Sequence, residues 1–284
     1  MAEGGPSGLL LIDKPAGITS HDAVSQVRRV MGVRRVGHAG TLDPMATGLL
    51  VMGVGRATRL LRFIGDSPKL YEGVGVLGVE TTTLDAEGEV VRERPVDVSV
   101  QELRAALYSL QGDIHQIPPA YSAVKVGGRK LYEAARMGEE LVAAPRRVHV
   151  HAFNLRGFEP PRFRFRVRCS GGTYVRSLVA EVGAILQCGA HLAELRRTAI
   201  GPFRLEDAGS PDEPGALLPL ERAVEHLAAV SLDQEEAIAA THGRVLGPTG
   251  IAGPYRALDP AGRLIGVYRD EGAKSVPEVI LALR

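Results

Sequence analysis

The sequence lacks several features that would place it in common protein classes. Tryptophan is absent, aromatic residues make up only 5% of the 284 positions, and there are two cysteines, Cys169 and Cys188. Their spacing is not that of zinc ligands and they are too few for a disulfide framework, so we expect a cytoplasmic protein with reduced thiols. No apolar run approaches the roughly 20 residues of a membrane helix, and the first residues form no basic export segment. We therefore expect no membrane association.

Basic residues are concentrated in the first part of the chain. The whole sequence has a net charge of +1, but residues 1–204 carry 27 Lys and Arg against 20 Asp and Glu, whereas residues 205–284 carry 7 against 13. Phosphate contacts from Lys and Arg dominate nucleic-acid affinity, so this distribution favours a polyanion-binding body with an acidic appendage. The chain has 29 arginines and only 5 lysines, but this imbalance adds little support for nucleic-acid binding, because codon usage explains it equally well.

The length suggests about two domains, each with a buried core. We expect a main domain over residues 1–227 and a small β-rich domain over residues 228–284. An acidic, proline-rich connection from about residue 202 to 227 is expected to hold one helix. In the small domain the patterns predict a helix at Asp233–Thr241 and short strands around 256–258, 264–268 and 276–283, with a turn between the first two strands.

Several elements of the main domain are predicted by periodicity and capping residues. Gly8–Asp13 is a short apolar run of the buried-strand type. A helix beginning at Thr19 or Ser20 and ending at Gly32 places its valines on one face. Ser99 and Glu102 form a capping box that starts a second helix. Further segments predict a helix over 129–136, a strand with alternating arginines over 162–169 and a helix from Val175.

The most unusual segment is the loop Gly37–Gly48, which precedes the apolar run Leu49–Met52. Its twelve residues include three glycines and an Asp-Pro pair, a composition that excludes regular helix or central strand. Asp43 is held out of the helical region by Pro44, so the loop presents a single carboxylate in a defined bend. Composition alone leaves two interpretations open, an ordinary surface turn and a functional carboxylate.

The order of the residues Gly-His-Ala-Gly-Thr-Leu-Asp-Pro-Met-Ala-Thr-Gly resembles the catalytic motif of the TruB family of tRNA pseudouridine-55 synthases. In that family the aspartate is the catalytic carboxylate, which implies this role for Asp43. The resemblance covers about residues 8–205. Other segments that resemble the family are Asp13-Lys14-Pro15, Lys69-Leu70-Tyr71, 116–136, Tyr174-Val175-Arg176 and 189–198.

The resemblance implies a role for further residues. Tyr71 would stack on the target base. The sequence around Arg176 is compatible with an exposed charge at a helix end or with a partner for a buried carboxylate. The resemblance implies the second role, in which Arg176 would pair with Asp43 and hold the pKa of Asp43 down. His38 would fill the space that the base leaves, and Leu195 would lie against the flipped base. Lys14 would buttress the loop and contact substrate. The basic residues expected to contact RNA are Arg59, Lys69, Lys125 and Lys130.

The resemblance also implies the fold and the reaction. The fold would be the α+β pseudouridine synthase fold, a mixed and mainly antiparallel sheet flanked by helices, with a shortened PUA-like RNA-binding module over residues 228–284. The reaction would convert uridine to pseudouridine at position 55 in the T-loop of tRNA, by base flipping, cleavage of the glycosidic bond and rejoining through C5. No cofactor, no metal and no obligatory protein partner would be needed. The sequence does not choose between a nucleophilic Asp43 and a glycal-type intermediate.

Three other interpretations stay open at this point. The basic body is also compatible with a noncatalytic RNA-binding module. The family resemblance includes the related RNA-guided synthase subunit, although the absence of a long basic tail favours a stand-alone enzyme. Gly53-Val54-Gly55 after a strand suggests a dinucleotide-binding oxidoreductase, but the third glycine of that fingerprint is missing. A metal site at His149 and His151 would need further ligands that the sequence does not place nearby.

Overall fold

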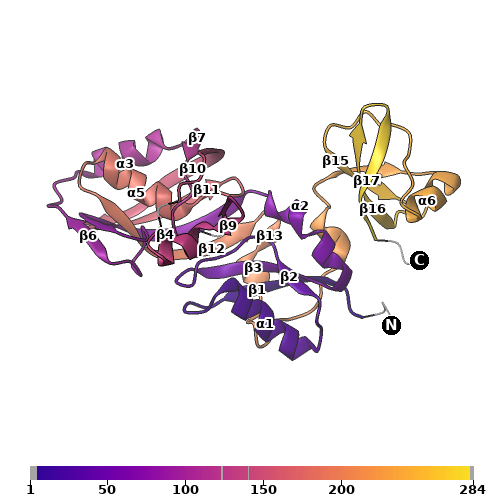
Figure 1. The fold of residues 1–284 in the computed structure, drawn as a ribbon, viewed down its shortest axis with the longest axis horizontal. Helices are drawn as coiled ribbons and strands as arrows, with labels where there is room; N and C mark the ends of the chain where they lie inside the picture. Colours follow the sequence, from indigo (N-terminus) through magenta and orange to yellow (C-terminus); the bar gives the residue numbers. More distant parts are fainter. Residues whose placement is uncertain (1–4, 123, 140, 282–284) are drawn as a thin grey trace.

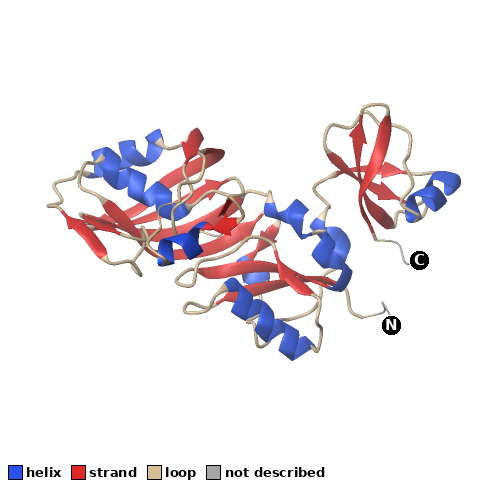
Figure 2. Ribbon diagram, viewed as in Figure 1, coloured by secondary structure: helices blue, strands red, loops and turns tan. Residues whose placement is uncertain are grey.

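The computed structural model describes residues 5–122, 124–139 and 141–281. Within these ranges the chain forms a main body around a nine-stranded sheet and a smaller part around a four-stranded sheet (Figures 1 and 2). In the described part of the chain no helix is long and apolar enough to cross a membrane.

The large sheet has the order β1-β3-β12-β4-β11-β10-β7, with β2 added to β3 and β13 added to β12. Neighbouring strands are antiparallel, except for the parallel pair β12 and β3 at the centre. A mixed, mainly antiparallel sheet was predicted, and this prediction is confirmed. The strands are β1 (Gly8–Lys14), β2 (Val36–His38), β3 (Thr47–Val54), β4 (Lys69–Leu77), β7 (Gly112–Gln116), β10 (Arg146–Glu159), β11 (Arg162–Cys169), β12 (Ala190–Ile200) and β13 (Phe203–Arg204).

Three longer helices flank this sheet: α1 (Ser20–Met31), α3 (Val100–Ser109) and α5 (Val175–Ile185). Helix α1 packs against β1 and β3, whereas α3 and α5 cover the part formed by β4, β11 and β10 (Figure 1). The predicted caps are present, because Thr19 is the N-cap of α1, Gly32 ends α1 in the left-handed conformation, and Ser99 forms a capping box with Glu102. Local sequence therefore determines where α1 and α3 begin.

Strand β11 shows the predicted alternation. Phe163, Phe165 and Val167 are buried against α3 and α5, while the intervening arginines lie on the opposite face of the sheet. The two faces of this part of the sheet are therefore chemically distinct, one an apolar core and the other a cationic surface.

Two predicted elements differ in the structure. The connection before the small sheet contains no α-helix among its described residues, only the 3-10 turns η2 (Leu205–Asp207) and η3 (Leu220–Ala223), because its prolines interrupt helical hydrogen bonding. The helix expected from Arg129 begins at Leu131 as α4 (Leu131–Arg136). Residues 129–130 instead form β9 (Arg129–Lys130), which pairs with β8 (Lys125–Val126).

The small sheet consists of β14 (Ala228–Ser231), β15 (Pro254–Leu258), β16 (Leu264–Glu271) and β17 (Lys274–Ile280), with α6 (Gln234–Thr241) packed beside it. It docks on η1 (Gly55–Arg59) and α2 (Leu61–Gly65) of the main body. Arg56 donates to the carbonyl of Leu281 at 2.7 Å, and Arg62 pairs with Glu278 at 2.6 Å. A separate short hairpin, β5 (Val79–Thr81) with β6 (Val90–Glu93), extends from the end of β4.

Candidate active site

Asp43 lies on the loop between β2 and β3, and hydrogen bonds from buried polar side chains fix the conformation of this loop. The Ser20 hydroxyl accepts a hydrogen bond from the amide of Leu42 at 2.8 Å. Lys14 is fully buried, and its Nζ donates to the carbonyls of Pro15, Ile18 and Pro44 at 2.8, 2.7 and 3.2 Å. Burial lowers the pKa of Lys14 to about 8. The structure thus places Lys14 beneath the loop, and its predicted contact with substrate stays a prediction.

Arg176, on the first turn of α5, faces Asp43. Its Nε lies 2.9 Å from Oδ2 of Asp43, and its Nη2 donates to Oδ1 at 3.2 Å. The guanidinium is fixed by two further hydrogen bonds, to the carbonyls of Thr83 at 2.8 Å and Tyr121 at 2.9 Å. The Arg176 side chain is 4% exposed, whereas that of Asp43 is 35% exposed. The cation is therefore locked in the protein while the carboxylate remains accessible.

A second carboxylate, that of Asp85, shares the same guanidinium. Its Oδ2 lies 3.3 Å from Nη1 of Arg176, and its side chain is only 4% exposed. The turn after β5 holds it in place, since Oδ1 accepts a hydrogen bond from the amide of Glu87 at 3.1 Å. No sequence pattern singles out Asp85. Its position in a polar, turn-rich segment was the only local signal, and that pattern is equally typical of a surface loop.

The surroundings raise the pKa of Asp43 above its usual value. Burial of the carboxyl group is the largest cause; the Arg176 charge opposes it, and the Asp85 charge adds to it. Arg176 acts in the expected direction, but burial and Asp85 together outweigh it. Arg176 thus lowers the pKa of Asp43 as expected, but the pKa of Asp43 is still higher than its usual value.

Asp43 and Arg176 line a cavity of about 240 Å³ together with three more of the predicted residues, Tyr71, Lys69 and Leu195. The side chains come from the loop before β3, from β4, from β12 and from the first turn of α5. Tyr71 is 6% exposed, so its ring forms part of the wall of the cavity. Residues distant in sequence thus line one open cavity with an acidic, a cationic and an aromatic component.

The other predicted residues lie outside this cavity. His38 is at the end of β2, and burial lowers its pKa, which favours the neutral imidazole. Arg59 donates to the carbonyl of Ile280 at 2.6 Å and so contacts the small sheet. Lys125 is exposed on β8. The Lys130 side chain is outside the described part of the chain, and the predicted contacts of these residues with RNA stay predictions.

Arg197 also lines the Asp43 cavity, although no sequence pattern predicted a role for it. It is fully buried, and among the described residues no carboxylate lies within ion-pair distance of it. Its Nε donates to the carbonyl of Leu49 at 2.7 Å and its Nη2 to that of Gly40 at 3.0 Å. The guanidinium carbon lies 6.0 Å from the centre of the Tyr71 ring. One buried cation therefore connects the loop of Asp43 to the wall formed by Tyr71.

In the described ranges no group of three or more His, Cys, Asp and Glu side chains is placed to hold a metal ion. The two histidines of β10, His149 and His151, lie edge to face with their ring centres 4.5 Å apart. Nδ1 of His149 lies 3.0 Å from Asp113 on the neighbouring strand β7. This arrangement is that of ordinary strand residues.

Comparison with known families gives three matches that together cover most of the chain. Residues 28–175 match the TruB family pseudouridylate synthase (N terminal domain), a match that includes more than half of the sequence. Residues 176–212 match the tRNA pseudouridylate synthase B C-terminal domain. Residues 227–282 match tRNA Pseudouridine synthase II, C terminal.

Relatives and solved structures agree with these matches. A tRNA pseudouridine synthase B of Thermobifida fusca is 46% identical over 288 residues, covering 97% of this chain and 98% of the relative. One of Mycolicibacterium paratuberculosis is 44% identical with the same coverage. A chain in the crystal structure of a Cbf5-Nop10-Gar1 complex superposes with a TM-score of 0.73 at 25% identity, covering 97% of this chain and 84% of that one. The predicted pseudouridine synthase fold is thus confirmed, and the chain belongs to the TruB family of pseudouridylate synthases.

Proposed function

We propose that this protein converts uridine to pseudouridine at position 55 in the T-loop of tRNA, acting alone on the T-arm. The observation that carries the proposal is the accessible Asp43 carboxylate, paired with the buried Arg176 in a cavity walled by Tyr71. Relatives named tRNA pseudouridine synthase B, similar over nearly the full length of both chains, support tRNA as the substrate. Residues 1–227 would form the catalytic domain and residues 228–284 a shortened PUA-like RNA-binding module, in a cytoplasmic enzyme.

The geometry fits an extruded base. A base within a folded RNA loop must leave its stack before a protein group can reach it, at a cost of a few kcal/mol. Stacking on the Tyr71 ring would return roughly 1–3 kcal/mol of that cost. Leu195 would contact the same base from β12, because both side chains line the cavity with Asp43.

The reaction needs an ionised Asp43 on either chemical route. The bond between N1 and C1′ breaks, the base rotates, and a bond forms between C5 and C1′, while the proton lost from C5 is balanced by one gained at N1. The carboxylate would act as a nucleophile at C1′ or as a base toward a glycal-type intermediate. The atoms balance without an added cofactor or co-reactant. Arg176 would keep the carboxylate oriented and oppose its protonation.

The test uses the purified chain and a tRNA transcribed without modifications. Carbodiimide labelling should reveal one pseudouridine in the T-loop at position 55, and a transcript with cytidine at that position should show none. A noncatalytic RNA-binding protein would leave both transcripts unlabelled. A subunit that needs an RNA guide or protein partners would also produce no label on bare transcript, and either outcome would contradict the proposal.

The raised pKa of Asp43 predicts an acid limb in the activity profile. Because the ionised form is required, single-turnover rates should fall as the pH decreases through that pKa. Asp85→Asn removes a negative charge that raises the pKa of Asp43, so the limb should move to lower pH. The plateau rate should also fall, by about tenfold or more, because a neutral amide holds the Arg176 guanidinium less firmly than the Asp85 carboxylate does. Rates of both proteins measured between pH 4 and 8 check the shift.

Glu89→Gln is the matched control for Asp85→Asn, since it removes a carboxylate from the same segment at an exposed position. Its pH profile should coincide with that of the wild type. An Asp85→Asn profile that keeps its acid limb unchanged would show that Asp85 has no electrostatic influence on Asp43.

Arg197→Met should lower kcat by about 10²-fold, since small displacements of positioned groups have effects of this size. The change leaves the carbonyls of Gly40 and Leu49 without their donor, so the loop that carries Asp43 loses its support. Arg196→Met is the matched control, because the neighbouring arginine is exposed and pairs with Asp13 at 2.7 Å. Kinetics of the two variants provide the comparison, and equal activities would exclude a positioning role for Arg197.

A further inference from the structure

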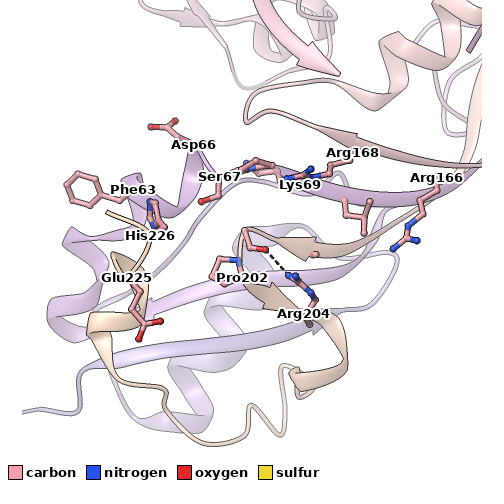
Figure 3. Close-up of a pocket in the computed structure, with 14 residues that line it drawn as sticks. Phe63, Asp66, Ser67, Lys69, Arg166, Arg168, Pro202, Arg204, Glu225 and His226 are labelled. Carbon is pink, nitrogen blue, oxygen red and sulfur yellow. Dashed lines mark hydrogen bonds between the residues drawn. The ribbon is translucent and has the colours of Figure 1, made fainter. Parts of the chain in front are cut away.

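A second and larger cavity, of about 860 Å³, lies next to the Asp43 cavity. It is bounded by the loop between α2 and β4, by β11 and β13, and by the end of the connection that precedes β14 (Figure 3). Asp43, Tyr71 and Arg176 do not line it. The mechanism proposed above therefore assigns it no role.

The walls of this cavity are rich in cations. Lys69 from β4, Arg166 and Arg168 from β11, and Arg204 from β13 all line it (Figure 3). Two acidic residues, Asp66 and Glu225, line it as well, and Glu225 is already paired with Arg222 at 2.8 Å. The cations of the wall thus outnumber its acidic groups.

The arginines of β11 fall into two classes. Arg162 pairs with Glu194 at 2.7 Å, Arg164 pairs with Glu159 at 3.1 Å, and Arg166 has a carboxylate 3.8 Å away. Arg168, and Arg204 across the cavity from β11, have no carboxylate within ion-pair distance in the described part of the chain. Both side chains are exposed. The arginines of β11 are therefore mostly paired with carboxylates, whereas Arg168 and Arg204 at this cavity have none among the described residues.

The two cavities share a wall. Lys69 lines both of them, and Gly65 of the Asp43 cavity is followed directly in the chain by Asp66 of the second cavity. The Nζ atom of Lys69 donates to the carbonyls of Gly65 at 2.6 Å and Ser67 at 3.2 Å, which holds the loop between α2 and β4 in place. A polymer with one unit in the Asp43 cavity could thus continue into the second cavity across this single loop.

We propose that the second cavity binds the phosphodiester backbone of the RNA strand that flanks the flipped uridine, with Arg168 and Arg204 as its phosphate contacts. The proposal rests on the proposed function. A guanidinium presents paired N–H donors that match two phosphate oxygens, and it stays charged at any physiological pH. The cavity lies beside the base-binding space and not within it, so these arginines affect RNA affinity and not the chemical step.

The test compares the double variant Arg168→Ala/Arg204→Ala with Arg162→Ala/Arg164→Ala, which removes two exposed charges from the same strand outside this cavity. Affinity for a T-arm hairpin and for full-length tRNA is measured by filter binding across a salt series. Losing two contacts to single-stranded phosphates should weaken binding about tenfold at 0.15 M salt and reduce the salt slope by roughly 1.4. The control variant should bind like the wild type, and the single-turnover rate at saturating enzyme should be unchanged in both.

Each other outcome overturns the proposal. Unchanged affinity would mean that the cavity does not contact RNA. Equal losses in the two double variants would indicate diffuse charge attraction, and a loss confined to full-length tRNA would place the contact far from the target nucleotide. A reduced rate at saturation would move these arginines into the catalytic machinery. Pseudouridine formation by the wild type on the same hairpin tests the proposed function separately, so failure of one is distinguishable from failure of the other.

Discussion

Replacing Asp43 by asparagine is expected to reduce pseudouridine formation by about 10⁴-fold or more, as is common when an essential reacting group is removed. The substitution keeps the size of the side chain and one oxygen acceptor for Arg176, but it removes the charge that either chemical route requires. RNA affinity should be retained, because Tyr71, Lys69 and Leu195 still line the cavity. Single-turnover assays with saturating enzyme separate the loss of the chemical rate from any change in RNA affinity.

The stability of the Asp43→Asn protein serves as its internal control. A carboxyl group whose pKa is higher in the folded than in the unfolded state stabilises the fold while it is protonated, and this contribution is lost as the pH rises through the folded pKa. At neutral pH the neutral amide should therefore unfold at the same temperature as the wild type or higher. Asp97→Asn, at an exposed position, should be fully active. Turnover retained by Asp43→Asn would remove this carboxylate from the mechanism.

Much of the secondary structure was accessible from the sequence because its signals are local. The capping residues Thr19 and Ser99 define where α1 and α3 begin, and Gly32 ends α1 because it accommodates the left-handed conformation. The strict alternation over 162–169 identified β11. The expected helix in the connection before β14 was wrong, since this proline-rich stretch forms only the short 3-10 turns η2 and η3.

The pairing of Asp43 with Arg176 spans 133 positions, and only the resemblance to the family connected the two residues. Asp85 and Arg197 were not identified, for a common reason. Which of the adjacent arginines 196 and 197 points into the protein depends on the register of β12 against β3, which no local pattern specifies. Likewise, Asp85 contacts Arg176 only because of the conformation of the turn after β5, which no local pattern specifies.

The direction of the Asp43 pKa shift was also beyond local reasoning. The sequence indicated that a cation would lie near this carboxylate, and Arg176 does. It did not indicate how much water the surrounding elements exclude, nor that a second carboxylate would share the cation. Desolvation depends on all the atoms packed around a group, so it follows from the tertiary structure alone.

Arg176→Lys is expected to lower kcat by about 10²-fold or more although the positive charge is kept. The guanidinium contacts Asp43 and Asp85 and also donates to the carbonyls of Thr83 and Tyr121, from three nitrogens in one plane. A single ammonium nitrogen does not reproduce this fork. At least one buried partner would be left unsatisfied, at a cost of about 1–3 kcal/mol in the free energy of unfolding. Measured kcat and thermal unfolding check both effects.

The pH profile distinguishes this pairing from a purely structural role of Arg176. A weaker cationic contact leaves burial and Asp85 to raise the pKa of Asp43 further, so the acid limb of Arg176→Lys should move to higher pH, opposite to the shift expected for Asp85→Asn. Arg162→Lys makes the same change at an exposed pair with Glu194, where a surface ion pair contributes only about 0–1 kcal/mol, and it should affect neither rate nor profile. If Arg176→Lys loses activity without moving the limb, Arg176 supports the fold of the site and does not act on the ionisation of Asp43.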